Sequence, residues 1–190
     1  MKIIIKKAKS RFLEMIDNFG SDPFRLANHV PEAEKWAKFV LGKYPKADKD
    51  VVLLAVWLHD IGHYPIPKID HAIISEKIAE EFLIHENYDK EKSKKVLHSV
   101  RAHRCLDAMP QTLEAKIMAF SDSASHITDS VYINIARDDI KKREKYNLIY
   151  SKMERDYRDL SLFPEIQKKL KPLSIAWKNL IKEYEKNDLG

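Results

Sequence analysis

The pair His59-Asp60 stands at the end of an apolar run, Val51 to Leu58, and is the first feature of the sequence that could do chemistry. Asp48 is placed to cap the start of a helix over this run, and Gly62 is placed to close its end. The pair would then lie in the last helical turn, where the helix dipole presents partial negative charge. A carboxylate is unfavourable there unless a cation lies beside it. Because the adjacent histidine offers a neutral nitrogen ligand, a bound divalent metal would resolve this conflict.

Other potential ligands recur on both sides of this pair. They are His29, His71, His98, His103 and Asp122. His29 stands just before Pro31, at an expected helix N-terminus, where the dipole disfavours the imidazolium and leaves a neutral nitrogen for a metal. Asp122 interrupts an apolar stretch, and a buried carboxylate must be paired, hydrogen-bonded or metal-bound. Taken singly, each also fits a structural role: His29 could bond backbone at a helix entry, and His59-Asp60 could be a capping pair.

The order H…HD…H…H…H…D on a helical background resembles that of the HD-domain metal-dependent phosphohydrolases, from about His29 to Asp129. Three later segments look like further blocks of that family: Asp70–Ser75, Val96–His103 and Ala115–Asp122. The resemblance implies an all-α HD-domain bundle. It also implies one divalent metal, possible identities being manganese, iron, nickel, magnesium or zinc, held by His29, His59, Asp60 and Asp122.

A second group of histidines comprises His71, His98 and His103. In dinuclear members of the family, histidines in such blocks hold a second metal. His98 and His103 are five residues apart, about 140° around an ideal helix, and could meet one ion only if His103 lies at the helix end or beyond it. In the alternative, these histidines line a phosphate-binding cleft together with Arg101 and Arg104, whose guanidinium groups match phosphate oxygens.

Two further residues near the pair are candidates for the reaction itself. Lys68, on the loop after the pair, could bind a substrate phosphate. His63 could protonate a leaving oxygen, or it could cap the helix end. Asp60 could both ligate the metal and orient the attacking water.

The composition favours helices throughout. Only four glycines occur in 190 residues, and apolar positions recur at intervals of three and four. We expect one domain over residues 1–190 with about seven or eight helices, a metal-binding core at about 20–136 and a C-terminal helical layer at 137–190.

The helix boundaries follow from caps, glycines and prolines. The sequence predicts helices over Ile3–Phe19, from Pro31 to Gly42, after Asp48, from Asp70 to Asn87, from Asp89 to Arg104 and after Pro110-Gln-Thr112, followed by long charged helices interrupted at Phe163-Pro164.

The net charge of +5 is distributed unevenly. Residues 1–11 carry five Lys/Arg and no acid, residues 137–190 have a net charge of +4, and residues 12–136 have a net charge of −4. An acidic core suits cation binding and argues against a grip on long nucleic acid. The basic ends are interpreted as solvated helix surface, and the C-terminal layer could form a homodimer surface.

Two further features of the sequence bear on the cellular location of the protein and on the kind of metal site that it can form. The longest apolar run is far too short to span a membrane, and the N-terminus lacks a signal-peptide cleavage site, so we expect a cytoplasmic protein. Cys105 is the single cysteine, which excludes an intramolecular disulfide and a cysteine-rich zinc site.

The predicted function is hydrolysis of a phosphate ester of a nucleotide or another small phosphorylated metabolite. Arginines would offset the transition-state charge. The sequence after the pair, Ile61-Gly62-His63, matches neither the HDxxED of guanosine-tetraphosphate hydrolases nor the lysine of HD-GYP phosphodiesterases, so the substrate stays open. Two alternatives remain: a dinuclear iron oxygenase of the HD fold, and a non-catalytic binding or signalling module.

Overall fold

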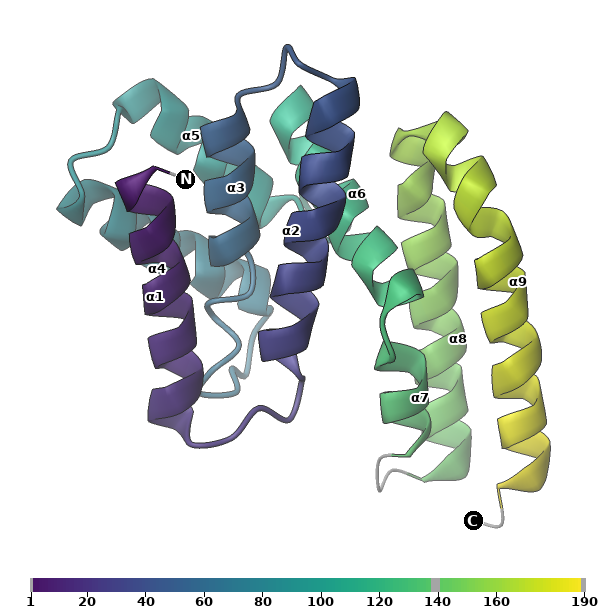
Figure 1. Cartoon of the computed structure of the whole chain (residues 1–190). Coiled ribbons are helices and arrows are strands. Elements are labelled where there is room, and N and C mark those ends of the chain that lie inside the picture. The colour runs from purple at the N-terminus through teal and green to yellow at the C-terminus, as the bar shows by residue number, and fades with distance from the viewer. Residues whose placement is uncertain (1, 138–140, 189–190) are drawn as a thin grey trace. The chain divides into compact units, whose positions relative to one another are not determined.

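The structure is a computed structural model that describes residues 2–137 and 141–188 (Figure 1). These residues form nine α-helices, a short 3₁₀ helix over Leu160–Leu162 and no strand. The helices are α1 (Ile3–Phe19), α2 (Leu26–Lys43), α3 (Lys49–Leu58), α4 (His71–His85), α5 (Lys90–Arg101), α6 (Leu113–Thr128), α7 (Val131–Ala136), α8 (Lys142–Asp159) and α9 (Pro164–Asn187). The predicted all-α fold is confirmed. Among the described helices, none combines the length and the apolarity that crossing a bilayer needs.

The chain divides into two compact units, Met1–Asp122 and Ser123–Gly190. The division falls within α6, whereas the sequence placed the end of the core at about residue 136. Every candidate ligand and substrate-binding residue predicted from the sequence belongs to the first unit, with Asp122 as its last residue.

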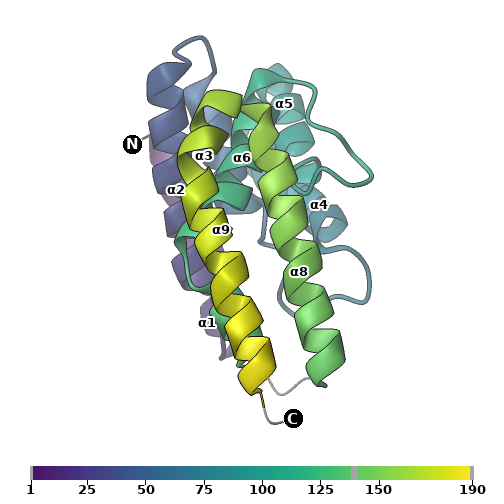
Figure 2. The ribbon, with the colours of Figure 1, turned by 90° about the vertical axis from the view of Figure 1, so that its right-hand side faces the viewer.

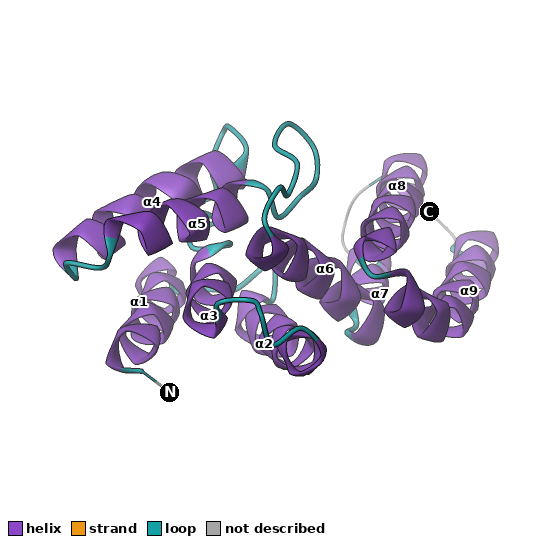
Figure 3. Cartoon of the chain, turned by 90° about the horizontal axis from the view of Figure 1, so that it is seen from above, coloured by secondary structure: helices purple, strands orange, loops and turns teal. Residues whose placement is uncertain are grey.

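Helix α3 is the centre of the first unit. Every side chain from Val51 to Leu58 is at most 2% exposed. The helix contacts α1, α2, α4 and α5, and Figure 3 shows it between α1 and α2, with α4 and α5 lying across them. A helix that is apolar all round is expected to be buried on all sides. Its end therefore delivers the next two residues, His59 and Asp60, into the interior.

Three aspartates cap the helices that the sequence assigned to them. The Asp48 carboxylate accepts hydrogen bonds from the backbone N–H groups of Asp50 and Val51, at 3.0 and 3.4 Å. Asp70 caps α4 and Asp89 caps α5 in the same manner, each with one bond of 2.9 Å. These three predictions are confirmed, and the caps fix where the helices that flank the pair begin.

Loss of the Asp48 cap should destabilise the first unit. Replacing an N-cap aspartate by alanine removes the acceptor for two orphan N–H groups and costs about 1 kcal/mol. We therefore expect Asp48→Ala to lower the free energy of unfolding by about that amount. Asp48→Asn, which keeps a capping oxygen, should lower it less. Urea unfolding of both variants checks this, and equal losses would show that the contribution of Asp48 comes from its charge, since Lys92 Nζ lies 2.7 Å from it.

Helix α2 begins five residues earlier than the sequence predicted. Its first two N–H groups, of Leu26 and Ala27, donate to the Asp22 carboxylate at 2.8 and 2.9 Å, so the cap comes from four residues upstream. Pro31 lies inside the helix. His29 consequently lies in the first turn of α2, and its N–H donates to the Arg25 carbonyl at 3.1 Å.

The assignment of Gly62 as the end of α3 was wrong. The helix ends at Leu58. Gly62 instead lies where the chain passes close to α4: a Cβ at this position would lie 2.5 Å from the backbone nitrogen of Ser75. Its N–H donates to Ser75 Oγ at 2.9 Å. The glycine is required by packing of this segment against α4.

The second unit holds α7, α8 and α9, and α7 was not anticipated from the sequence. Figure 2 shows α8 and α9 side by side, and the two helices run in opposite directions through the turn before Pro164. Asp156 is 2% exposed, accepts a 2.8 Å hydrogen bond from the Tyr132 hydroxyl, and lies 3.4 Å from His126 Nδ1 and 3.5 Å from Lys152 Nζ. These partners compensate its buried charge.

Candidate metal site

Four donor atoms from three parts of the first unit meet in one buried place. They belong to His29 on α2, to His59 and Asp60 directly after α3, and to Asp122 on α6. All four residues are at most 7% exposed. His29 Nε2 lies 2.9 Å from Asp122 Oδ1, 3.3 Å from His59 Nε2 and 3.5 Å from Asp60 Oδ2. His59 Nε2 in turn lies 3.4 Å from Asp60 Oδ2 and 3.5 Å from Asp122 Oδ1.

These separations fit a set of ligands around one ion. Nitrogen and oxygen ligands lie about 2.0–2.2 Å from a transition-metal ion, which places neighbouring ligands of an octahedron or tetrahedron about 3.0–3.5 Å apart. The five distances given above span 2.9 to 3.5 Å. Two imidazole nitrogens and two carboxylate oxygens are also donors that divalent metals of this type accept. These five separations and the chemistry of the four residues fit a divalent metal, and His29, His59 and Asp60 each offer an atom within 4.8 Å of the other two.

The orientation of His59 is fixed by the helix that precedes it. Its Nδ1 atom lies 2.8 Å from the carbonyl oxygen of Val56. A carbonyl can only accept a hydrogen bond, so Nδ1 carries the proton. With Nδ1 as donor, the lone pair of the neutral ring is on Nε2, the atom that faces His29 and the two carboxylates. Such a bond to a carbonyl is the usual means of fixing the tautomer of a metal-binding histidine.

A second group of donors lies on the other side of Asp60. Asp60 Oδ1 lies 3.2 Å from His71 Nε2 and 3.7 Å from His103 Nε2, and these two nitrogens are 3.2 Å apart. His103 is oriented as His59 is, because its Nδ1 donates to the Val100 carbonyl at 2.6 Å. The two oxygens of one carboxylate thus face two different pairs of histidines. Asp60 could ligate one ion through each oxygen.

Charge is balanced within the cluster by protein groups. Burial disfavours the imidazolium of His59, but the charge of Asp60 and the contact with Asp122 outweigh it and raise the pKa of His59 to about 10. Burial raises the pKa of Asp60, yet the charges of His59 and His63 hold it well below its usual range. The carboxylates therefore draw a proton onto His59 Nε2, and a bound cation would take the place of that proton.

The pKa of His103, in the second group, is shifted in the opposite direction to that of His59. Burial lowers the pKa of His103 to about 3, and the positive charge of His59 acts in the same direction. His103 is therefore neutral at pH 7. A neutral imidazole keeps the lone pair that a metal needs.

The four candidate ligands lie within a segment that matches a known family. The model of the HD domain matches residues 26–127, more than half of the chain. The protein belongs to the HD-domain family. Most members of this superfamily are metal-dependent hydrolases. No curated protein and no solved structure matches the chain.

His63 of this HD domain lies beside the second group. Its ring stacks on that of His71, with centroids 3.9 Å apart and planes at 23°, and its Nε2 lies 3.6 Å from Asp60 Oδ1. Burial lowers the pKa of His63 to about 4, against the opposing effect of Asp60. It does not cap α3, which ends at Leu58. Phe24, about half exposed, lies next to the ring of His63, with centroids 4.8 Å apart.

His98 does not join the histidines with which the sequence grouped it. Its Nε2 accepts a 2.9 Å hydrogen bond from the backbone N–H of Gln111. In the described part of the chain, the groups of donors close enough for one ion include His71 and His103 but not His98. The reason is the end of α5 at Arg101: His98 lies inside the helix, while His103 lies beyond it, where the chain can turn back to Asp60.

The two arginines predicted to bind phosphate are held by carboxylates. Arg101 pairs with Asp107 and lies 3.5 Å from Glu76. Arg104 pairs with Asp70, the cap of α4, which directly precedes His71. Burial raises the pKa of Asp70, but Arg104 and the capping bond lower it to about 2.

Lys68 differs from the arginines. It is exposed, and none of the residues described by the structure forms an ion pair with it.

Two features that position the HD-domain site were missed in the sequence. The Ser75 hydroxyl accepts a hydrogen bond from the Gly62 N–H, and this bond connects the segment after Asp60 to α4. Tyr64 donates its hydroxyl hydrogen to Asp22 Oδ1 at 2.6 Å, which joins that segment to the cap of the His29 helix. Gly62 and Tyr64 alone do not indicate these hydrogen bonds in the sequence, because their partners Ser75 and Asp22 are 13 and 42 residues away.

Proposed function

We propose that this protein is a divalent-metal-dependent phosphohydrolase that acts on a nucleotide or another small phosphate ester. The observation that carries the proposal is the buried set of four donor atoms of His29, His59, Asp60 and Asp122, within a chain that belongs to the HD-domain family. A bound divalent metal supplies a Lewis acid that lowers the pKa of water and offsets negative charge on phosphoryl oxygens.

The residues on the second side of Asp60 supply the proton chemistry. Asp60 Oδ1 does not face His29 or His59. It can therefore accept a hydrogen bond from a water molecule and orient the lone pair of that water for attack. His63, whose pKa is about 4, is neutral at pH 7 and must take up a proton before it can protonate a leaving oxygen. Its Nε2 lies 3.6 Å from Asp60 Oδ1, so a water molecule held by Asp60 would be within reach of His63 and could give it the proton that the water loses on attack.

Metal analysis followed by a phosphate-release screen over nucleotides and sugar phosphates tests the function. His29→Ala should lose both metal and activity, because it removes the donor that contacts all three other ligands. His85→Ala, which changes a histidine on the exposed side of α4, is the matched control and should keep both. Phosphate release by metal-depleted protein at the rate of the loaded protein would contradict the proposal.

The two arginines near the second group of donors are the candidates for binding the substrate phosphate. We expect at least one of Arg101 and Arg104 to contact a substrate phosphate. Arg104 pairs with Asp70, the residue that directly precedes His71. Removing a charge-assisted hydrogen bond should lower kcat/KM at least about tenfold, with metal content unchanged. Single alanine variants, assayed on a substrate from the screen, check this. If both act at the parent rate, the phosphate is held elsewhere, and Lys68→Ala is the variant to measure next.

A dinuclear iron oxygenase is the second candidate. It is favoured by one observation, the position of Asp60 with an oxygen toward each pair of histidines. The metal content separates the two. For the hydrolase we expect one tightly held metal per chain, with His71→Ala weakening turnover without emptying the four-ligand site. Two irons per chain with oxygen consumption, and no phosphate release, would instead support the oxygenase.

A further inference from the structure

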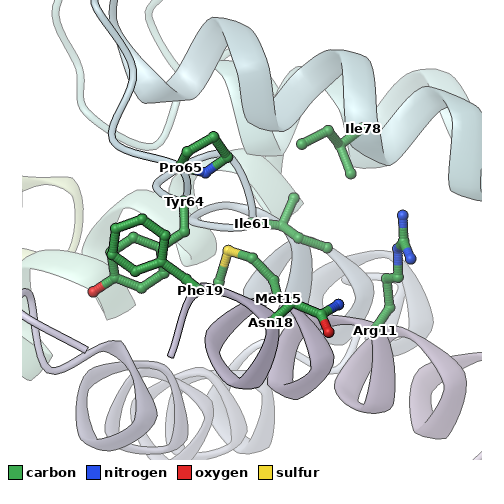
Figure 4. Close-up of a pocket in the computed structure, with 8 residues that line it drawn as sticks. All are labelled: Arg11, Met15, Asn18, Phe19, Ile61, Tyr64, Pro65 and Ile78. Atoms are coloured by element: carbon green, nitrogen blue, oxygen red, sulfur yellow. The ribbon is translucent and has the colours of Figure 1, made fainter. Parts of the chain in front are cut away.

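A cavity of about 350 Å³ lies behind the segment that carries Asp60 (Figure 4). One wall is a face of α1, another is the segment after Asp60, and a third is Ile78 of α4. The cavity is open to solvent on one side, and Arg11 and Asn18 are exposed there. The lining residues are Arg11, Met15, Asn18, Phe19, Ile61, Tyr64, Pro65 and Ile78. A volume of this size is in the range of small-molecule sites.

The lining is apolar except at α1. Ile61 and Tyr64 are buried, and the ring of Tyr64 stacks on Phe19, with centroids 4.6 Å apart. In Figure 4, Met15 and Ile78 lie between this ring pair and Arg11. Since eight residues of a helix span about 12 Å, Arg11 and Phe19 stand at opposite ends of the α1 wall. The cavity therefore has an apolar end and a cationic end.

The two polar groups of the lining are not used by the described part of the protein. Neither the Arg11 guanidinium nor the Asn18 amide has a hydrogen-bond or ion-pair partner among residues 2–137 and 141–188. The nearby Lys7, on the same helix, is paired with Glu86 at 2.6 Å. A guanidinium presents parallel N–H donors that match a carboxylate, and a single cation suits a monoanion.

We propose that this cavity binds a small free monocarboxylate with an apolar body, the carboxylate on Arg11 and the apolar part toward Phe19 and Tyr64. The site is distinct from the donor cluster: none of its lining residues is among the candidate metal ligands. The inference does not rest on the proposed phosphohydrolase activity. It assigns a second small-molecule site to the first unit, against the segment that holds Asp60.

Calorimetric titration with octanoate tests the proposal, with octan-1-ol and octylamine as neutral and cationic probes of the same chain length. Octanoate should bind with one molecule per chain, octan-1-ol at least about tenfold more weakly, and octylamine more weakly still. Arg11→Met keeps the length of the side chain and removes its charge. It should weaken octanoate about tenfold while leaving octan-1-ol unchanged.

Two further variants make the result specific to the cavity. Lys6→Met removes an exposed cation of α1 that does not line the cavity, and it should leave octanoate binding unchanged. Ile78→Trp adds bulk to the wall and should abolish binding of octanoate and octan-1-ol. Metal content and helical circular dichroism are measured for each variant, because the lining is separate from the donor cluster and both should match the parent.

Absence of octanoate binding by the folded parent would overturn the proposal. So would octanoate affinity that is equal to that of octylamine, or that is retained in Arg11→Met or in Ile78→Trp protein with parental circular dichroism. Failure of the phosphate-release screen leaves these outcomes unaffected, since none of them depends on turnover.

Discussion

Asp60→Ala should yield a folded protein that is purified without its metal. Asp60 is the only one of the described residues that faces both pairs of histidines, with Oδ2 toward His29 and His59 and Oδ1 toward His71 and His103. Loss of a group that merely supports a ligand costs 10–100-fold in metal affinity, so loss of this ligand should cost at least about 100-fold. Elemental analysis of the purified variant measures this directly.

Helix content is the necessary companion measurement for Asp60→Ala. Asp60 lies beyond the end of α3 and caps none of the helices around it, so circular dichroism should be close to that of the parent. Asp17→Ala, an exposed aspartate on α1, is the matched control and should keep its metal. Full metal occupancy in Asp60→Ala would remove this residue from the ligand set and with it the proposed arrangement of the site.

Gly62→Ala should be the most disruptive replacement among the three glycines that the structure describes. The new Cβ would lie 2.5 Å from Ser75 N, 2.8 Å from the His71 carbonyl oxygen and 2.8 Å from Ile74 Cβ. Two of these atoms are backbone, which cannot rotate away. Overpacking typically costs about 1–3 kcal/mol, and here the shift would also displace Asp60 from α4 and from His71. We expect reduced stability in urea together with reduced metal content.

Gly42→Ala is the control for the Gly62 result. An added Cβ at Gly42 meets no atom within 4 Å, and alanine is the better helix former in α2. This variant should be as stable as the parent or more so. Parental stability and metal content in Gly62→Ala would mean that α4 can move away from the segment, contrary to the close packing described above.

Local patterns predicted much of the fold. The bounds of α1 were predicted as the structure has them, from a helical pattern ended by Gly20, whose φ of 76° is the left-handed conformation that glycine favours. The caps of α3, α4 and α5 were found because an N-cap aspartate bonds to N–H groups only two or three residues away. Where one short segment contains both the signal and its partner, the sequence alone is sufficient.

Tertiary contacts account for the errors. The start of α2 was missed because Asp22 caps it across an irregular turn at Arg25, whose φ is positive. Gly62 was assigned to a helix end because a tight turn and a close approach to another helix need the same residue type. His98 was grouped with His103 on the family resemblance. His103 does lie beyond the end of α5, as that grouping required, but His98 bonds to the distant Gln111 N–H, which the sequence does not show. The ligand role of the four predicted residues stays a prediction that metal analysis can test.

Because its four candidate ligands are joined only by folding, the protein should also respond to metal supply as a whole. His29 and Asp122 lie on different helices and close a long loop of chain only in the native state. An ion that binds the folded chain and not the unfolded one stabilises it by mass action, by about 2.7 kcal/mol at a free concentration one hundred times its Kd. The melting temperature would then rise with the logarithm of free metal. In a cell short of the metal, the unloaded protein would therefore be degraded faster by proteases, so that its abundance would fall together with its activity.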